Sequence, residues 1–185
     1  MSDIEKAMKQ ANQFDLDFVA RKHSLEYGVP LETVRTWIPE LKHWLVLCAV
    51  NPDSSYTLFG RIDWLWHSFI EFTIEYRDFC MAIAGRPIEH VPDVPTEEEL
   101  QKIIQAKKIK QESVHEEKLA FIGGQGNKSR PNTIIPYKKE QVDGYAKLLK
   151  DYKNFFPDKT PHPDVWPRIL KDGYIDCPGG CCGGV

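Results

Sequence analysis

The sequence predicts an all-α fold, an irregular helical bundle around one central buried helix at about residues 61–84, followed by a flexible Gly- and Cys-rich tail. Apolar residues recur at three- and four-residue steps in several segments, and the two-residue alternation typical of strands is almost absent. The chain has 185 residues, 42% hydrophobic and 11% aromatic, which is enough apolar surface for a core. We expect one helical domain over residues 1–176 and a tail over residues 177–185.

The first two helices are predicted from their periodicity and their ends. One helix is expected over Phe14–Tyr27, because Gly28 follows it and glycine commonly ends helices. The next is expected to run toward Val50, because apolar residues share one of its faces. That face consists of Val34, Trp37, Ile38, Leu41 and Leu45.

The central helix is predicted over Arg61–Ala84, because its apolar residues cover nearly every side of a helical wheel. They are Ile62, Trp64, Leu65, Trp66, Phe69, Ile70, Phe72, Ile74, Tyr76 and Phe79. A helix that is apolar all round is buried among its neighbours. Gly85 and Pro87 are expected to end it, and an extended connector that contains His90 follows.

The second half of the chain is predicted to hold two more helices, separated by a mobile loop. Thr96 and Glu99 have the spacing of a capping box, which would begin a highly charged helix. Residues 123–136 are rich in Gly, Asn, Ser and Pro and predict a mobile loop; they lack the flanking strand and helix of a phosphate-binding loop. Three- and four-residue steps between Val142 and Phe156 predict a further amphipathic helix.

Composition argues against nucleic-acid and membrane partners. The formal net charge is -3 and the pI is about 6.1, so no global positive field attracts phosphates. The longest apolar run, Trp44–Val50, is far shorter than the roughly 18 to 20 residues that cross a bilayer. The segment Met1–Gln13 lacks the apolar core of a secretory signal, and the five cysteines do not form a disulfide-framework pattern. A cytoplasmic location is expected.

Two polar residues of the central segment are candidates for chemistry. Asp63 and His67 are four residues apart and therefore share one helix face, as in two-ligand metal sites on helices. His90 could supply a third ligand, and a carboxylate with two imidazoles suits zinc or another divalent metal. The alternative is a hydrogen-bonded buried pair without metal, since buried polar groups need partners.

The tail contains three closely spaced thiols. Cys177, Cys181 and Cys182 form the pattern C-x-x-x-C-C among glycines, which could serve a soft metal, a redox partner or a modifying enzyme. The tail has no nearby histidine or second cysteine pair, as a zinc finger would, and an unmodified flexible tail is the alternative. Cys48 and Cys80 lie on apolar helix faces and are expected to pack as small hydrophobes.

Several motifs in the middle of the chain follow one known pattern. The chain reads D-W-L-W-H-S-F-I from Asp63, T-x-x-Y-x-x-F-C from Thr73 and H-V-P from His90. This set resembles the glycine-rich domain-containing protein-like family, whose pattern is approximately D-x-x-W-H-x-H-I, T-x-x-Y-x-x-F-C and H-x-P. The resemblance covers about residues 14–166, and Gly- and Cys-rich tails are typical of this mostly uncharacterised family. One departure is Phe69, which stands where the pattern has a second histidine.

The residues that match this pattern are interpreted as one buried polar cluster. Asp63, Trp66, His67, Tyr76 and His90 would tie the central helix to the connector, and they are also the candidate ligand site. Because Phe69 offers no donor atom, a metal role for the family's paired histidines is weakened in this chain.

Two functions remain as hypotheses, and enzyme activity is left open in the second. The first is a non-enzymatic helical scaffold or protein-interaction domain, whose tail or charged helix at Thr96–Lys118 contacts a protein partner. The second is a metal- or small-molecule-binding protein that uses Asp63, His67 and His90. Neither the ligand, the partner nor the oligomeric state follows from the sequence.

Overall fold

The computed structural model of the chain describes residues 2–91, 94, 96–98, 100–101, 104–105, 138–170 and 175–176. It divides into two units. The first consists of Met1–Ile88 and Asn132–Val185, and the second consists of Glu89–Pro131. The first unit contains α1 (Asp3–Ala11), α2 (Asp17–Tyr27), α3 (Leu31–Val50), α4 (Arg61–Ile70), α5 (Thr73–Ala84), α7 (Lys139–Phe155), β1 (Arg168–Ile169) and β2 (Ile175–Asp176). The all-α prediction is confirmed, with a two-stranded sheet added.

Some sequence predictions fall on residues outside this description. The expected mobile loop at 123–136 and the tail at 177–185 both lie there, and so do the three tail thiols. In the second unit, residues 97–98, 100–101 and 104–105 are helical, and the Leu100 backbone N–H donates to the Thr96 carbonyl at 2.8 Å. The capping partner Glu99 also lies outside the described residues.

The first two helices are defined by their caps. Helix α1, which the sequence did not predict, begins with a capping box in which Ser2 Oγ accepts from the Glu5 backbone and Glu5 accepts from the Ser2 backbone. Helix α2 begins at Asp17, later than expected. It ends at Gly28, whose φ of 67° is the left-handed conformation that favours glycine, so the predicted cap is confirmed.

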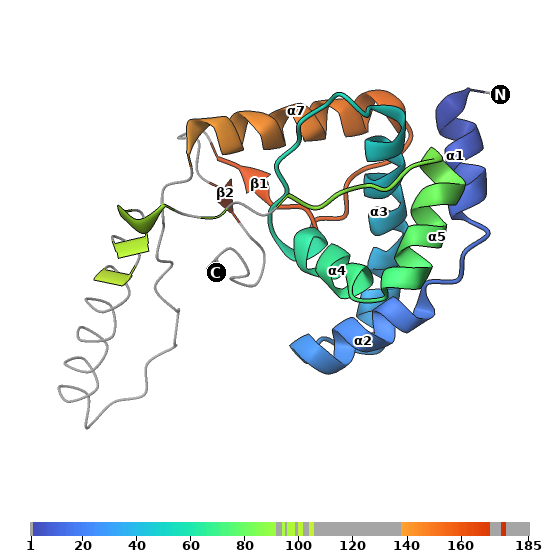
Figure 1. Cartoon of the computed structure of the whole chain (residues 1–185), viewed down its shortest axis with the longest axis horizontal. Helices are drawn as coiled ribbons and strands as arrows, with labels where there is room; N and C mark the ends of the chain where they lie inside the picture. Colours follow the sequence, from blue (N-terminus) through green and yellow to red (C-terminus); the bar gives the residue numbers. More distant parts are fainter. Residues whose placement is uncertain are drawn as a thin grey trace. The chain divides into compact units, whose positions relative to one another are not determined.

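Helix α3 lies at the centre of the first unit and packs against α1, α2, α4, α5 and α7 (Figure 1). Val34, Trp37, Leu41 and Leu45 of its predicted apolar face are each 0% exposed. The prediction that the centre is the 61–84 segment was wrong. At 20 residues, α3 is about 30 Å long, so several helices can pack along it.

None of the helices in the described part of the chain is long and apolar enough to cross a membrane.

The prediction of one continuous helix over Arg61–Ala84 was also wrong, because the chain divides it into α4 and α5. The division lies at Glu71 and Phe72, where the Phe72 backbone leaves the helical conformation with φ −86° and ψ 68°. In one straight helix, Phe69 and Phe79 would stand about 15 Å apart along the axis. Here their ring centroids are 5.4 Å apart, since the chain folds back and buries both apolar segments against each other.

Helix α7 brings the C-terminal part of the first unit against α3 (Figure 1). The predicted amphipathic helix is confirmed, and Tyr145, Leu148 and Tyr152 are 0% exposed. Tyr145 Oη donates to the Pro167 carbonyl at 2.8 Å. A Cβ at Gly60, the residue before α4, would lie 2.7 Å from Pro167, so the start of α4 also contacts this segment closely. The strands β1 and β2 pair antiparallel, with Arg168 opposite Asp176 and Ile169 opposite Ile175.

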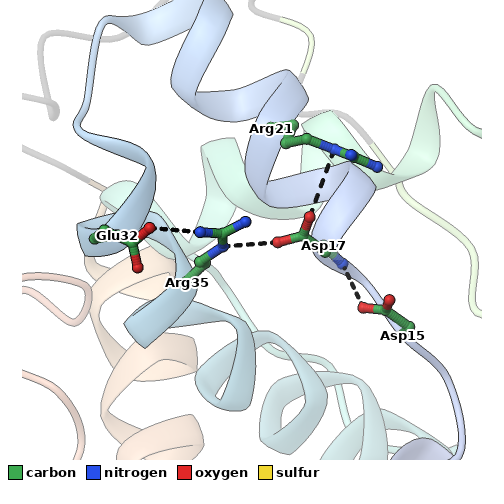
Figure 2. Close-up of polar contacts among 5 residues, drawn as sticks. All are labelled: Asp15, Asp17, Arg21, Glu32 and Arg35. Atoms are coloured by element: carbon green, nitrogen blue, oxygen red, sulfur yellow. Dashed lines mark hydrogen bonds and ion pairs between the residues drawn. The ribbon is translucent and has the colours of Figure 1, made fainter.

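Salt bridges join the starts of α2 and α3 (Figure 2). Arg35 Nε donates to Asp17 Oδ1 at 2.8 Å, and the same guanidinium pairs with Glu32. Asp17 also pairs with Arg21 at 3.5 Å, and its backbone N–H donates to Asp15 at 2.9 Å. The hydrogen bond from Arg35 lowers the pKa of Asp17. Ion pairs this exposed contribute little to stability, so the apolar core holds α2 and α3 together.

Helix α7 meets the loop before α4 at Gly144. A Cβ at this position would lie 2.7 Å from Thr57 Oγ1 and 3.2 Å from the Thr57 backbone nitrogen. We expect Gly144→Ala to lower the free energy of unfolding by about 1 to 3 kcal/mol through overpacking. This cost opposes the higher helix propensity of alanine, which favours the helix by about 1 kcal/mol relative to glycine. Urea denaturation measures this, with Asp143→Ala at the exposed neighbouring position as control. A Gly144→Ala variant as stable as the wild type would contradict the close contact.

Candidate functional site

Asp63 and His67 lie one turn apart on α4 and face each other. His67 Nδ1 is 2.8 Å from the Asp63 backbone oxygen and 3.6 Å from Oδ1 of the Asp63 carboxylate. The side chains of Asp63 and His67 are 28% and 44% exposed, respectively. The two residues therefore share the face that their spacing predicts, at the edge of the core rather than inside it.

The hydrogen bond to the backbone fixes the tautomer of a neutral His67. A carbonyl oxygen can only accept, so Nδ1 carries the proton and donates it to the Asp63 carbonyl. The acceptor lone pair of the imidazole is then on Nε2. Metal-binding histidines commonly use this arrangement, in which a carbonyl holds one ring nitrogen and the other nitrogen binds the metal.

The Asp63 carboxylate is poorly stabilised as an anion. Burial raises the pKa of Asp63 to about 6, although the nearby His67 opposes the rise. Within the described part of the chain, this carboxylate accepts no hydrogen bond, and its ion-pair partner His67 remains 3.6 Å away. A half-buried carboxylate in these surroundings favours either a proton or a cation.

Trp66 and Tyr76 form a hydrogen-bonded chain next to this pair. Trp66 Nε1 donates to Tyr76 Oη at 3.0 Å, and Tyr76 Oη donates to the Ile88 carbonyl at 2.7 Å. The chain links α4 and α5 to the start of the connector. His90, the third candidate ligand, belongs to the second unit, and its part in the site stays a prediction.

A second pair of acid and histidine lies inside the core, and the sequence did not predict it. Glu40 and His43 of α3 are each 8% exposed. Glu40 Oε2 accepts hydrogen bonds from Tyr152 Oη at 2.8 Å and from Trp166 Nε1 at 2.7 Å. His43 Nδ1 lies 3.1 Å from Tyr152 Oη. The available signal was that Glu40 lies three residues after Trp37, and so on the side of the helix that carries the predicted apolar face.

The hydrogen bonds hold Glu40 in its charged form. Burial alone would raise the pKa of Glu40, but the interactions with His43, Trp166 and Tyr152 outweigh burial and hold it below its ordinary value. Burial and the adjacent carboxylate raise the pKa of Tyr152, so its hydroxyl keeps a proton and donates it to Glu40. His43 Nδ1 must then donate to Tyr152 Oη. With its donors in place, this carboxylate has a structural role.

A buried His23–Ser68 contact was also missed. Both residues are 1% exposed. Ser68 Oγ donates to the Trp64 carbonyl at 3.1 Å, so it accepts from His23 Nδ1, which is 2.9 Å away. Burial lowers the pKa of His23 to about 4, which keeps the imidazole neutral. Because solvent reaches neither side chain, the contact joins α2 to α4 and does not form an accessible nucleophile.

Three other residues singled out in the sequence belong to the packing. Phe69 is 0% exposed, and its ring packs edge-on against its aromatic neighbours on α5. Burial raises the pKa of both Cys48 and Cys80, so neither is a thiolate at neutral pH. The two cysteines therefore lack the reactivity of catalytic cysteines.

Comparison with known proteins gives no match to a family model, to a curated protein or to a solved structure. The resemblance to the glycine-rich domain-containing protein-like family therefore stays a prediction. The function has to be inferred from the chemistry of Asp63 and its neighbours.

The Glu40 hydrogen bonds give a pH-dependent contribution to stability. We expect Glu40→Gln to lower the free energy of unfolding by about 1 to 3 kcal/mol at neutral pH, because hydrogen bonds to a charged acceptor are the stronger ones. The folded pKa lies below the ordinary value of 4.5, so this contribution is complete above that pH and is lost as the pH falls through the folded pKa. The wild type and Glu40→Gln should therefore converge in acid.

Urea denaturation at neutral pH and at about pH 3 measures the convergence. Glu32→Gln is the matched control, because Glu32 lies on the same helix with its side chain exposed. Equal stability of the wild type and Glu40→Gln at neutral pH would show that the buried network does not stabilise the fold.

Proposed function

We propose that this protein binds a divalent metal ion such as zinc through Asp63, His67 and His90. The observation that carries the proposal is the half-buried Asp63 carboxylate, which faces His67 and lies in surroundings that raise its pKa to about 6. A divalent cation would supply the positive charge that stabilises the ionised carboxylate. The contrast with Glu40, whose carboxylate is stabilised by protein donors, supports a ligand role for Asp63 and not for Glu40.

The donor set suits a borderline metal. The three side chains offer one carboxylate oxygen and two imidazole nitrogens, which are common zinc ligands. Three protein ligands leave a fourth position of a tetrahedral site for water or a small molecule. The tautomer of His67 is consistent with this role, because the carbonyl of Asp63 takes the Nδ1 proton.

The chain is anchored to the first unit just before His90. Ile88 is 5% exposed, and its carbonyl accepts the hydrogen bond from Tyr76. Arg86 Nη2 donates to the Cys48 carbonyl at 3.1 Å, which anchors the connector to α3. His90 follows Ile88 by two residues, so their Cα atoms can be at most roughly 7 Å apart. This short tether supports His90 as the third ligand.

Calorimetric titration of the metal-free full chain with zinc tests the proposal. The chain should carry serine in place of Cys177, Cys181 and Cys182, so that tail thiolates cannot compete for the metal. We expect one zinc per chain in this parent protein. His67→Ala and His90→Ala should each weaken binding by at least about tenfold, because each removes a ligand.

Two further variants sharpen this titration. Asp63→Asn should weaken zinc binding as well, because the amide carries no charge. His162→Ala is the control, since it removes an imidazole whose Nδ1 accepts a hydrogen bond from the Asp164 backbone. It should bind zinc like the parent. A parent that binds no zinc, or ligand variants that bind as tightly as the parent, would contradict the proposal.

The second candidate function is a non-enzymatic helical scaffold or interaction domain with a protein partner in the cytoplasm. Helix α5 leaves Ile74 61% exposed and Met81 48% exposed. These residues are two turns apart and therefore lie on one side of the helix. Apolar side chains gathered on an exposed face are a feature of protein-binding surfaces. Absence of zinc binding in the titration would favour this candidate.

A further inference from the structure

The hydroxyl group of Tyr76 forms hydrogen bonds with two residues that are close in sequence to the candidate histidines His67 and His90. Its Oη accepts a hydrogen bond from Trp66 Nε1 at 3.0 Å, and Trp66 directly precedes His67. The same Oη donates to the carbonyl of Ile88 at 2.7 Å, two residues before His90. One hydroxyl thus connects the α4 part of the proposed site to the connector.

The direction of both hydrogen bonds is fixed by the chemistry of the groups. Burial raises the pKa of Tyr76, so its hydroxyl keeps its single proton. The Ile88 carbonyl can only accept that proton, and the indole N–H of Trp66 can only donate. The Tyr76 ring is also held edge-on against Phe69, with centroids 5.1 Å apart.

Both partners of the hydroxyl are anchored in the core. Trp66 is 6% exposed, and its ring packs edge-on against Trp44 with centroids 5.5 Å apart. The Ile88 side chain is 5% exposed. A shift of Trp66 would move His67, and a shift of Ile88 would move His90, because each pair is at most two residues apart in the chain.

We propose that Tyr76 is a positioning residue for metal binding, an inference that rests on the zinc site proposed above. Tyr76 does not bind the metal. Its hydroxyl restrains the separation of His67 and His90 by holding Trp66 and Ile88 together. Removal of a group bonded directly to a metal ligand typically weakens metal binding by roughly 10- to 100-fold, and the lower end of this range is expected for Tyr76, which acts through the neighbours of the ligands.

Tyr76→Phe tests this role, because it keeps the ring and removes only the hydroxyl. In the parent with serine at the three tail positions, calorimetry with zinc should show binding weakened by about tenfold or more, with an unchanged circular dichroism spectrum. Tyr152→Phe is the matched control. It also loses a hydrogen-bonded hydroxyl, whose partners Glu40 and His43 both lie on α3. It should bind zinc like the parent, even if its unfolding midpoint falls as far as that of Tyr76→Phe.

A second variant tests the same restraint without changing the core. One glycine inserted between Ile88 and the exposed Glu89 lengthens the tether to His90 and leaves the Tyr76 hydroxyl in place. It should also weaken zinc binding, and it provides the test if Tyr76→Phe does not fold.

The outcomes separate the two proposals. Parent protein that binds zinc, with unchanged affinity in Tyr76→Phe or in the insertion variant, would overturn the positioning role and leave the zinc site standing. An equal loss of affinity in Tyr152→Phe would also overturn it, because general destabilisation would then explain the effect. A parent that binds no zinc would overturn the zinc site and, with it, the role of Tyr76.

Discussion

One buried carboxylate couples distant parts of the first unit through its hydrogen bonds. Glu40 lies on α3, against which α1, α2, α4, α5 and α7 all pack. Its Oε2 accepts from Tyr152 on α7 and from Trp166 in the segment after α7. A buried carboxylate without partners would cost several kcal/mol. Docking of α7 and the following segment is therefore coupled to α3, across the long stretch of sequence that separates them.

Helices α3 and α4 each carry an acidic residue close to a histidine, but the two pairs lie in opposite surroundings. Glu40 and His43 lie inside the core with donors that lower the pKa of the carboxyl group. Asp63 and His67 lie at its edge, where burial raises the pKa of Asp63 to about 6 and no hydrogen-bond donor among the described residues stabilises the carboxylate. Groups with perturbed pKa values that do not serve the fold gather at functional sites. This contrast is why we interpret Glu40 as a structural residue and propose a cation at Asp63.

Local patterns in the sequence predicted most of the elements, and tertiary contacts decided the rest. The cap at Gly28 and the apolar periodicities of α3 and α7 are confirmed, because they depend on neighbouring residues. The break at Phe72 depends on packing between the two halves it separates. The spacing of Asp63 and His67 predicted their shared face but not their exposure. Glu40 finds its donors 112 and 126 residues along the chain, where local patterns give no signal.

Carbon-13 NMR of the side-chain carboxyl groups, followed against pH, measures both carboxylates in one sample. The central claim predicts that Glu40 titrates below its ordinary value of 4.5 and that Asp63 titrates near 6. It also predicts that zinc lowers the pKa of Asp63 and leaves that of Glu40 unchanged. An Asp63 that titrates at its ordinary value of 3.8, or that does not respond to zinc, would contradict a cation site at this carboxylate.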